Sequence, residues 1–216
     1  MKTKKIDIAI LVLILISFGI AIYSYPQMPE KMASHWNMKG EVDGYMHKGW
    51  ALYLMPGITA LMYLMFLIIP KIDPLKKNIE KFRAYFDWFI LLMVAFLFYI
   101  YILTIAANLE YAFNMTTMIL PAIGALFIYI GFLVQNAKRN WFIGIRTPWT
   151  LSSDAVWQKT HKLGGKLFKI AGILVLLSII FESIALWIVI GAALIAGLYP
   201  VVYSYFEYEK EKRKKH

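Results

Sequence analysis

The chain has 216 residues, of which 60% are hydrophobic and 17% are charged. Soluble domains average about 45–50% apolar and about 25% charged residues, because a globular core needs a polar shell. The composition therefore excludes a soluble enzyme, a disordered tail and an ordinary nucleic-acid-binding domain, and it predicts an all-α integral membrane protein. Since there is no cysteine, disulfides, thiolate metal sites and cysteine nucleophiles are also excluded. The net charge of +10 then becomes a question of orientation in the membrane.

Six apolar runs are long enough to cross a hydrocarbon core of about 30 Å as helices. They cover residues 6–24, 50–70, 86–107, 116–134, 167–182 and 184–206. Only Glu182 and Ser183 separate the last two runs, and we predict a tight turn there with Ser183 as the N-cap of the last helix. The first run is followed by no small-residue cleavage site, which indicates an uncleaved anchor helix rather than a signal peptide.

Basic residues are distributed unevenly between the two sides of the membrane. If the N-terminus is cytoplasmic, the cytoplasmic side carries 20 of the 23 Lys and Arg, and the other side carries only Lys31, Lys39 and Lys48. Because cytoplasmic segments are enriched in Lys and Arg, we expect both termini in the cytoplasm. We therefore predict a multipass protein of the cell membrane whose basic segments meet anionic lipid headgroups and bind no nucleic acid directly.

The external loop, residues 25–49, is richer in special residues than a connector needs. Its stiffening and turn-forming residues are Pro26, Pro29, Asn37, Gly40, Asp43 and Gly44. His35, Asp43 and His47 are weak candidate ligands for a divalent metal, although their spacings of eight and four residues match no established zinc pattern. The alternative is a compact loop in which His35 and Asp43 bond to each other and to the backbone. We expect no cofactor.

The cytoplasmic loop, residues 135–166, leads into the fifth apolar run through a predicted amphipathic helix. Ser152 or Ser153 is the candidate N-cap, with Asp154 in the first turn. Four residues then recur at helical spacing and form one face, namely Trp157, His161, Gly164 and Phe168. Gly164 and Gly165 allow a bend or a close contact between helices.

Two polar residues of this loop leave alternatives open. Arg146 has the guanidinium that binds a phosphate or carboxylate bidentately, or it bonds backbone carbonyls or lipid phosphates instead. His161 is a base or ligand, or a structural residue, as lone histidines at interfaces usually are. Because the sequence has no Gly-rich phosphate loop, no H-E-x-x-H and no G-x-S-x-G, we predict that the protein is not an enzyme.

Both loops carry motifs of a known family. The external pattern Y-P-x-M-P-E-K…H-W-N-x-x-G-x-x-D-G-Y…K resembles a module of unknown function that precedes the SdpI domain. The sequence from Asn140 to Lys166, N-W-F-I-G-I-R-T-P-W-T-L-S-S-D-x-V-W-x-K-T-H-x-L-G-G-K, resembles the signature of SdpI-type immunity proteins. The resemblance divides the chain into a two-helix module, residues 1–70, and a four-helix SdpI-like domain, residues 71–216.

The resemblance implies a membrane immunity or receptor protein without catalysis. The family's founding member protects a spore-forming bacterium from its own secreted peptide toxin, and it draws a transcriptional repressor to the membrane when toxin is present. The implied ligand-binding residues of the external loop are Pro29, His35, Trp36, Asn37, Gly40, Asp43, Gly44 and Lys48. The implied switch or partner-binding residues of the cytoplasmic loop are Asn140, Gly144, Arg146, Thr147, Pro148, Trp149, Thr150, Leu151, Trp157, Thr160, His161, Gly164 and Gly165.

Two other functions stay open. A metal-binding membrane enzyme would use His35, Asp43 and His47 on one side, or Arg146 and His161 on the other. An exporter of small amphipathic molecules is the third possibility. The sequence shows no mid-membrane ionisable pair and no internal repeat, both of which are common in transporters.

The topology is testable because the chain has no native cysteine. Cysteine introduced by Ser34→Cys should react with a membrane-impermeant maleimide on intact cells, and cysteine introduced by Ser153→Cys should react only after the membrane is permeabilised. The reverse pattern would contradict the cytoplasmic placement of the termini.

Overall fold

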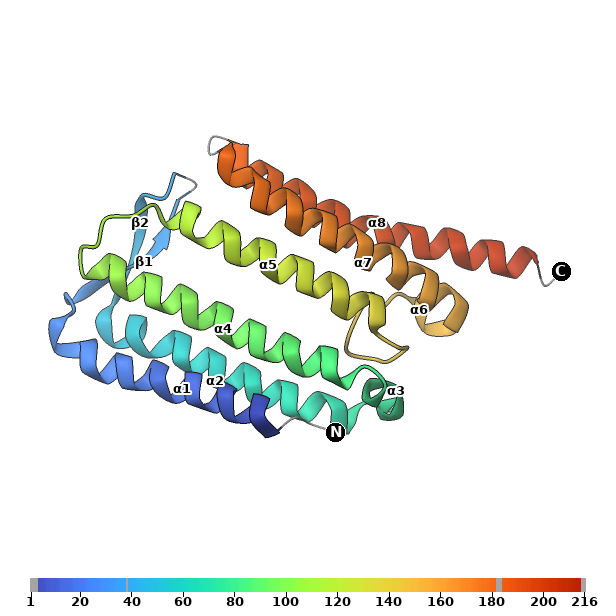
Figure 1. Ribbon diagram of the computed structural model, residues 1–216, viewed down its shortest axis with the longest axis horizontal. Helices are drawn as coiled ribbons and strands as arrows, with labels where there is room; N and C mark the ends of the chain where they lie inside the picture. Colours follow the sequence, from blue (N-terminus) through green and yellow to red (C-terminus); the bar gives the residue numbers. More distant parts are fainter. Residues whose placement is uncertain (1–3, 38, 182–183, 215–216) are drawn as a thin grey trace.

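The computed structural model describes residues 4–37, 39–181 and 184–214 (Figure 1). Within them, six helices are long and apolar enough to cross a membrane. They are α1 (Lys4–Ser24), α2 (Lys48–Ile72), α4 (Arg83–Asn108), α5 (Met115–Asn136), α7 (Asp154–Leu177) and α8 (Ala185–Arg213). The prediction of an all-α membrane protein with six spans is confirmed. The turn expected at Glu182 and Ser183 lies outside the described residues.

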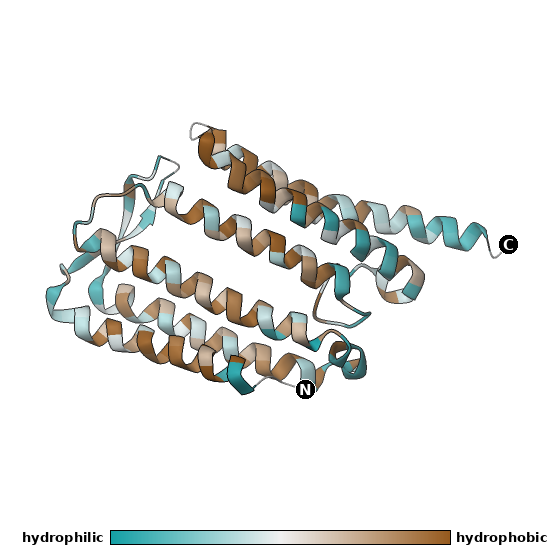
Figure 2. Cartoon of the chain, in the orientation of Figure 1, coloured by the Kyte–Doolittle hydropathy of each residue, from teal (hydrophilic) through white to brown (hydrophobic). Residues whose placement is uncertain are grey.

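The last two spanning helices are longer than the apolar runs that predicted them. Helix α7 begins at Asp154, because it includes the amphipathic helix predicted to lead into the fifth apolar run, and α8 continues to Arg213 instead of ending at 206. Hydropathy marks only the part of a helix that lies in hydrocarbon, whereas the helix itself continues into the polar interface. Figure 2 shows this directly, since the C-terminal part of α8 is hydrophilic. The predicted cap is confirmed, because the Ser153 hydroxyl accepts a hydrogen bond from the Val156 amide at 3.3 Å.

The six helices form two groups of three. Helices α1, α2 and α4 pack together, and helices α5, α7 and α8 form the second group, with α4 also contacting α5 (Figure 1). A large apolar core joins α1, α2 and α4 and reaches α5 and α7 through Leu133 and Trp157. Because α4, which follows residue 70, packs with α1 and α2 as well as with α5, the division of the chain at residue 70 stays a prediction.

Both described chain ends lie at the same end of the helical layer. The short helices α3 (Lys76–Glu80) and α6 (Pro148–Ser152) lie there too, and we call this the termini end (Figure 1). The opposite end is the hairpin end, formed by 3₁₀ helix η1 (Tyr25–Gln27) and strands β1 (Lys31–Trp36) and β2 (Val42–His47). A second 3₁₀ helix, η2 (Ser178–Ile180), follows α7. The placement of both termini at one end agrees with an even number of spans.

Acidic side chains within the spans are paired. The Tyr63 hydroxyl donates to the Asp7 carboxylate at 2.7 Å, and the Arg83 guanidinium pairs with buried Asp87 at 2.6 Å. Both pairs lie in the half of the spans near the termini end, where α1 and α4 begin. Pairing of this kind compensates charges that hydrocarbon would otherwise disfavour.

Glycines allow α5 and α7 to approach with their backbones in contact. A Cβ atom built on Gly165 would lie 2.6 Å from the Gly131 carbonyl oxygen, and one built on Gly172 would lie 2.5 Å from that of Gly124. The two glycines of each helix are spaced by two turns, so they line one face of each helix. Close packing of small residues is the usual source of helix association in lipid. The close-contact alternative for Gly165 is therefore confirmed.

The glycine contact between α5 and α7 predicts that an added methyl group changes the free energy of unfolding by an amount that depends on its position. Gly172→Ala should lower the free energy of unfolding by about 1–3 kcal/mol, because backbone atoms on α5 leave the added Cβ no room. Gly191→Ala in α8 is the matched control, since no atom lies within 4 Å of a Cβ there. Unfolding titrations in mixed detergent micelles measure both. Equal stability of the two variants would contradict the packing.

Candidate functional site

Residues 25–49, the predicted external loop, fold into an antiparallel β-hairpin, where the sequence predicted only a compact loop. The Asn37 side chain organises its turn by accepting from the amides of Lys39 at 2.8 Å and Glu41 at 3.1 Å. Gly40 has a φ of +80°, which strongly favours glycine. Asn37 and Gly40 therefore act as turn formers, as their residue types predict. The strands were missed because the segment contains few β-branched residues.

Two asparagines on neighbouring helices hold the hairpin in place. At the end of α4, Asn108 accepts from the Ala33 amide at 2.7 Å and donates to the Ala33 carbonyl at 3.0 Å. Asn114, the N-cap of α5, donates to the Lys39 carbonyl at 3.2 Å and lies against Gly40. Buried Met28 and Met32 add apolar contacts to α1, α2 and α4. The hairpin is thus fixed to the helices from several sides.

The histidines of the hairpin lie in two separate ion pairs. His35 pairs with Asp43 across the strands, as the sequence predicts, with His35 Nδ1 2.5 Å from Asp43 Oδ1. His47 lies 3.4 Å from Glu30, and Glu30 also pairs with Lys48 at 2.8 Å. The hydrogen bond and charge of Lys48 hold the pKa of the Glu30 carboxyl below its ordinary value. Among the described residues, no group of three or more His, Cys, Asp or Glu could hold a metal ion.

Several large side chains of the hairpin and its surroundings remain exposed. Tyr45 of β2 is 64% exposed and Trp50, at the start of α2, is 67% exposed. Val42 and Pro29 are also exposed, and Trp36 is half-buried. Gly44 faces His35 across a β-bulge, where a Cβ would lie 2.8 Å from that of His35. The hairpin end therefore presents an ordered surface with exposed aromatic residues.

At the termini end, Asn140 organises the irregular stretch between α5 and α6, residues 137–147, which we call the motif segment. Its side chain is fully buried, and its amide donates to the carbonyls of Lys138 and Ile143, both at 2.8 Å. Its oxygen accepts from the amides of Phe142 at 2.9 Å and Ile143 at 2.6 Å. One buried side chain thus satisfies four backbone groups of an irregular segment, and buried polar groups are costly when they are left unbonded.

Residues between α2 and α4 hold this segment from the opposite group of helices. Buried Asp73 accepts from the Trp141 amide at 2.8 Å, and Asn78 donates to the Arg139 carbonyl at 2.8 Å. The Trp157 indole donates to the Ala137 carbonyl at 2.9 Å from the other side. The motif segment therefore bridges the two groups of helices.

His161 is structural in this arrangement. Its Nε2 accepts from the Ile145 amide at 3.0 Å, which requires the proton on Nδ1, and Nδ1 donates to the Trp157 carbonyl at 2.8 Å. The ring stacks on Trp157 with centroids 3.9 Å apart. Gly144, with a φ of +112°, lies so close to His161 Nε2 that a Cβ would clash. Since both ring nitrogens are used and the side chain is buried, the histidine offers no free atom as base or ligand.

The remaining motif residues fix α6 and α7 against α8. Thr147 and Thr150 form a capping box, and the Thr147 hydroxyl bonds to that of Ser204 on α8 at 3.0 Å. Pro148 occupies the first turn of α6, and Trp149 packs edge-on against Tyr205 at 5.2 Å. Other motif residues lie in packing positions: Leu151 is half-buried, and Thr160, Gly164 and Gly165 are buried.

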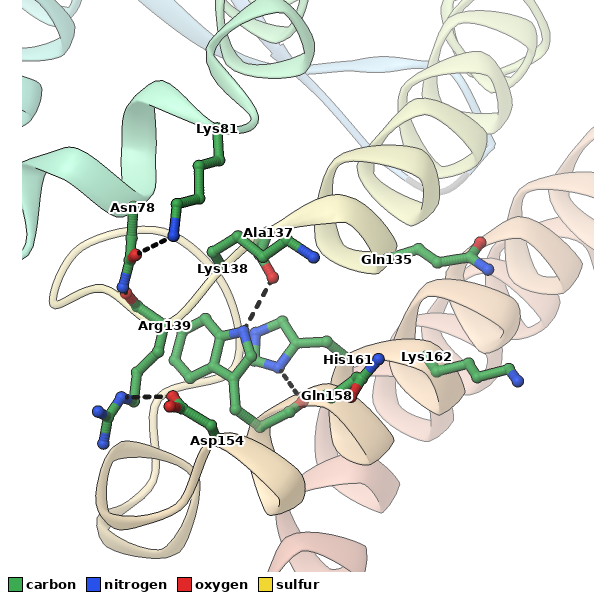
Figure 3. A pocket seen from close by; sticks show the side chains of 11 residues that line it. Asn78, Lys81, Gln135, Ala137, Lys138, Arg139, Asp154, Gln158, His161 and Lys162 are labelled. Carbon is green, nitrogen blue, oxygen red and sulfur yellow. Dashed lines mark hydrogen bonds and ion pairs between the residues drawn. The ribbon is translucent and has the colours of Figure 1, made fainter.

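A cleft of about 370 Å³ lies beside the motif segment at the termini end (Figure 3). Its charged lining residues are Lys81, Lys138, Arg139, Asp154 and Lys162. Arg139 pairs with Asp154 at 2.8 Å and also donates to the Leu151 carbonyl. The three lysines are exposed and leave the cleft basic. Arg146 lies outside it, and its guanidinium donates to the Trp141 carbonyl at 2.8 Å.

Sequence reasoning missed the residues that hold the motif loops from elsewhere in the chain. These are Asp73, Asn78, Asn108, Asn114 and Ser204. The available signal was polarity at helix ends, which is common and does not identify a partner. None of these residues was distinguishable from an ordinary polar residue at a membrane interface.

The fold and its two ordered polar ends define a multipass helical protein of the cell membrane. Residues 136–204 match the SdpI/YfhL protein family, and residues 12–60 match a domain of unknown function, DUF1648. The chain is 26% identical over 207 residues to Immunity protein SdpI of Bacillus subtilis (strain 168), covering 95% of this chain and 97% of the relative. No solved structure gives a significant match. These matches support the resemblance to SdpI-type immunity proteins that the two motifs indicated.

The hydrogen bonds of Asn140 predict that replacing its side chain strongly destabilises the protein. Asn140→Ala should lower the free energy of unfolding by about 2–4 kcal/mol, because buried backbone groups lose their partners. Asn136→Ala is the matched control, since Asn136 makes one helical hydrogen bond, to Phe132. Thermal unfolding in detergent and proteolysis within residues 138–147 report the change. A stable, protease-resistant Asn140→Ala protein would contradict the assigned role.

Proposed function

We propose that the protein protects its cell from a secreted peptide toxin by binding that peptide at the hairpin end. The observation that carries the proposal is the likeness to Immunity protein SdpI, which extends over 95% of the chain and therefore includes both motif loops. The basic termini end supports a cytoplasmic placement of that end, and hence an external hairpin. The hairpin then faces the compartment from which a secreted peptide arrives.

The hairpin offers a physical mode of peptide binding. In the described part of the chain β2 pairs only with β1, so its outer edge is available to an extended peptide. Tyr45 and Val42 supply exposed apolar contacts on β2, and Trp50 adds a third beside it. Because Asn108 and Asn114 already fix the hairpin, little ordering entropy is lost when a peptide binds.

The second half of the proposal is recruitment of a cytoplasmic transcriptional repressor by the termini end. The cleft with Lys81, Lys138 and Lys162 suits an acidic surface of such a partner. The hydrogen bonds from Asp73 and Asn78 to the motif segment join the two helix groups at this end. A toxin that favours one arrangement of these groups over another would change the surface offered to the repressor. Toxin-dependent movement of the repressor into the membrane fraction reports this half separately.

A protection assay tests toxin binding. Toxin-sensitive cells expressing the protein should survive challenge with the family's secreted peptide toxin, and Tyr45→Ala should raise toxin sensitivity about tenfold or more, because an exposed aromatic contact is lost. Tyr111→Ala is the matched control: Tyr111 is 67% exposed and lies between α4 and α5, outside the hairpin. Asp43→Ala should also reduce protection by breaking the pair with His35.

All three variants must be present in the membrane at wild-type levels for the comparison to hold. Full protection by the Tyr45→Ala and Asp43→Ala proteins would contradict binding through the hairpin. Equal loss in the Tyr111→Ala protein would show that the effect is not specific to β2.

A further inference from the structure

An apolar groove lies between the two helix groups, near the termini end and separate from the hairpin. It has a volume of about 480 Å³ and is lined by α2, α4, α5, α7, α8 and the motif segment. Its wall includes Phe66, Phe89, Ile130, Phe168 and Gly197. Phe66 and Phe89 pack edge-on with ring centroids 5.9 Å apart, which gives one wall a fixed shape. Every contributing helix is long and apolar enough to cross a membrane, so the groove opens among membrane-spanning helices.

Arg146 is the one charged residue of the groove lining. It is exposed, and one guanidinium nitrogen donates to the Trp141 carbonyl at 2.8 Å, which holds the side chain beside the groove. Within the described part of the chain, no carboxylate pairs with it. The remaining N–H groups form a planar fork of the kind that binds phosphate oxygens. Exposed Trp141 and Phe142 place this segment at the level of the lipid headgroups.

We propose that the groove binds an anionic phospholipid, with one acyl chain between the two helix groups and the phosphate on the Arg146 guanidinium. The apolar lining gives water almost no hydrogen-bond partners, so a hydrocarbon chain fills the groove at lower free energy than water does. An anionic headgroup is favoured because the guanidinium lacks an acidic partner and the surrounding termini end is basic. The site is independent of the proposed toxin binding, which uses the opposite end of the molecule.

Gly197 makes the groove itself testable. A Cβ at Gly197 meets no atom within 4 Å, so a large side chain there enters the groove without displacing the backbone. Gly191, on the same helix, is equally open and lies outside the groove lining. Gly197→Phe and Gly191→Phe are therefore a matched pair. For the charge, Arg146→Gln is matched by Arg213→Gln in the exposed last turn of α8.

The experiment is native mass spectrometry of the full chain released from nanodiscs of phosphatidylethanolamine and phosphatidylglycerol. We expect the wild-type chain to retain one phosphatidylglycerol, and Arg146→Gln to weaken retention about tenfold because a charge-assisted bond is lost. Arg146→Lys should restore part of it. Gly197→Phe should remove the lipid, while Gly191→Phe and Arg213→Gln retain it.

Three results would overturn the proposal. Equal retention by the Gly197→Phe and Gly191→Phe proteins would show that the lipid lies elsewhere. Equal loss in the Arg146→Gln and Arg213→Gln proteins would reduce the effect to the general basic charge of this end. A Gly197→Phe protein that keeps phosphatidylglycerol and loses toxin protection would assign the groove to the peptide instead. Unchanged unfolding midpoints of the variants confirm that each is folded.

Discussion

Buried backbone polar groups must find partners within the protein, and this constraint shapes both ends of the molecule. Helices satisfy their own amides and carbonyls, but the connections between them do not. The motif segment after α5 has no regular structure until α6 begins at Pro148. It is stable there because Asn140, Asp73 and the Trp157 indole bond its backbone from three directions. Much of the motif from Asn140 to Lys166, whose residues were predicted to bind a partner, therefore serves to form hydrogen bonds with the backbone.

Asparagine carries out the same task at the hairpin end. Asn37 closes the turn of the hairpin, Asn108 pairs with the edge of β1 as another strand would, and Asn114 caps α5 while bonding the hairpin turn. An amide side chain offers a donor and an acceptor spaced like those of a peptide group. Each asparagine side chain therefore makes hydrogen bonds that a peptide group of a neighbouring strand or turn would otherwise make. The exposed side chains between them, above all Tyr45 and Trp50, are then free to contact a ligand.

The sequence predicted the helical framework well, because the signal for a spanning helix is strong and local. All six spans and the cap at Ser153 agree with the structure, as does the pairing of His35 with Asp43. The hairpin strands were not predicted, since the loop lacks a run of β-branched residues and its register depends on contacts with Asn108 and Asn114. The extension of α8 was also missed, because hydropathy falls where a helix leaves hydrocarbon although the helix continues.

The roles of motif residues were the hardest to infer. Arg146 and His161 had equal standing as chemically active residues in sequence, yet the structure buries His161 with both nitrogens bonded and leaves Arg146 exposed. That difference depends on Gly144, whose positive φ allows the chain to pass close to the imidazole. No local pattern reveals which side chain a glycine makes room for.

The two groups of helices are joined covalently only by the link between α4 and α5, residues 109–114, where Glu110 adopts a φ of +64°. The hairpin spans this link, since Asn108 holds it on one side and Asn114 on the other. At the far end, the groups are held together by non-covalent contacts, among them the hydrogen bonds of Asp73 and Asn78 with the motif segment and the apolar packing of Leu133 and Trp157. The hairpin therefore braces the covalent link between the two groups, whereas at the termini end the groups have no covalent connection. A small change in the angle between the two helix groups at this link gives a larger displacement at the termini end, roughly one helix length away.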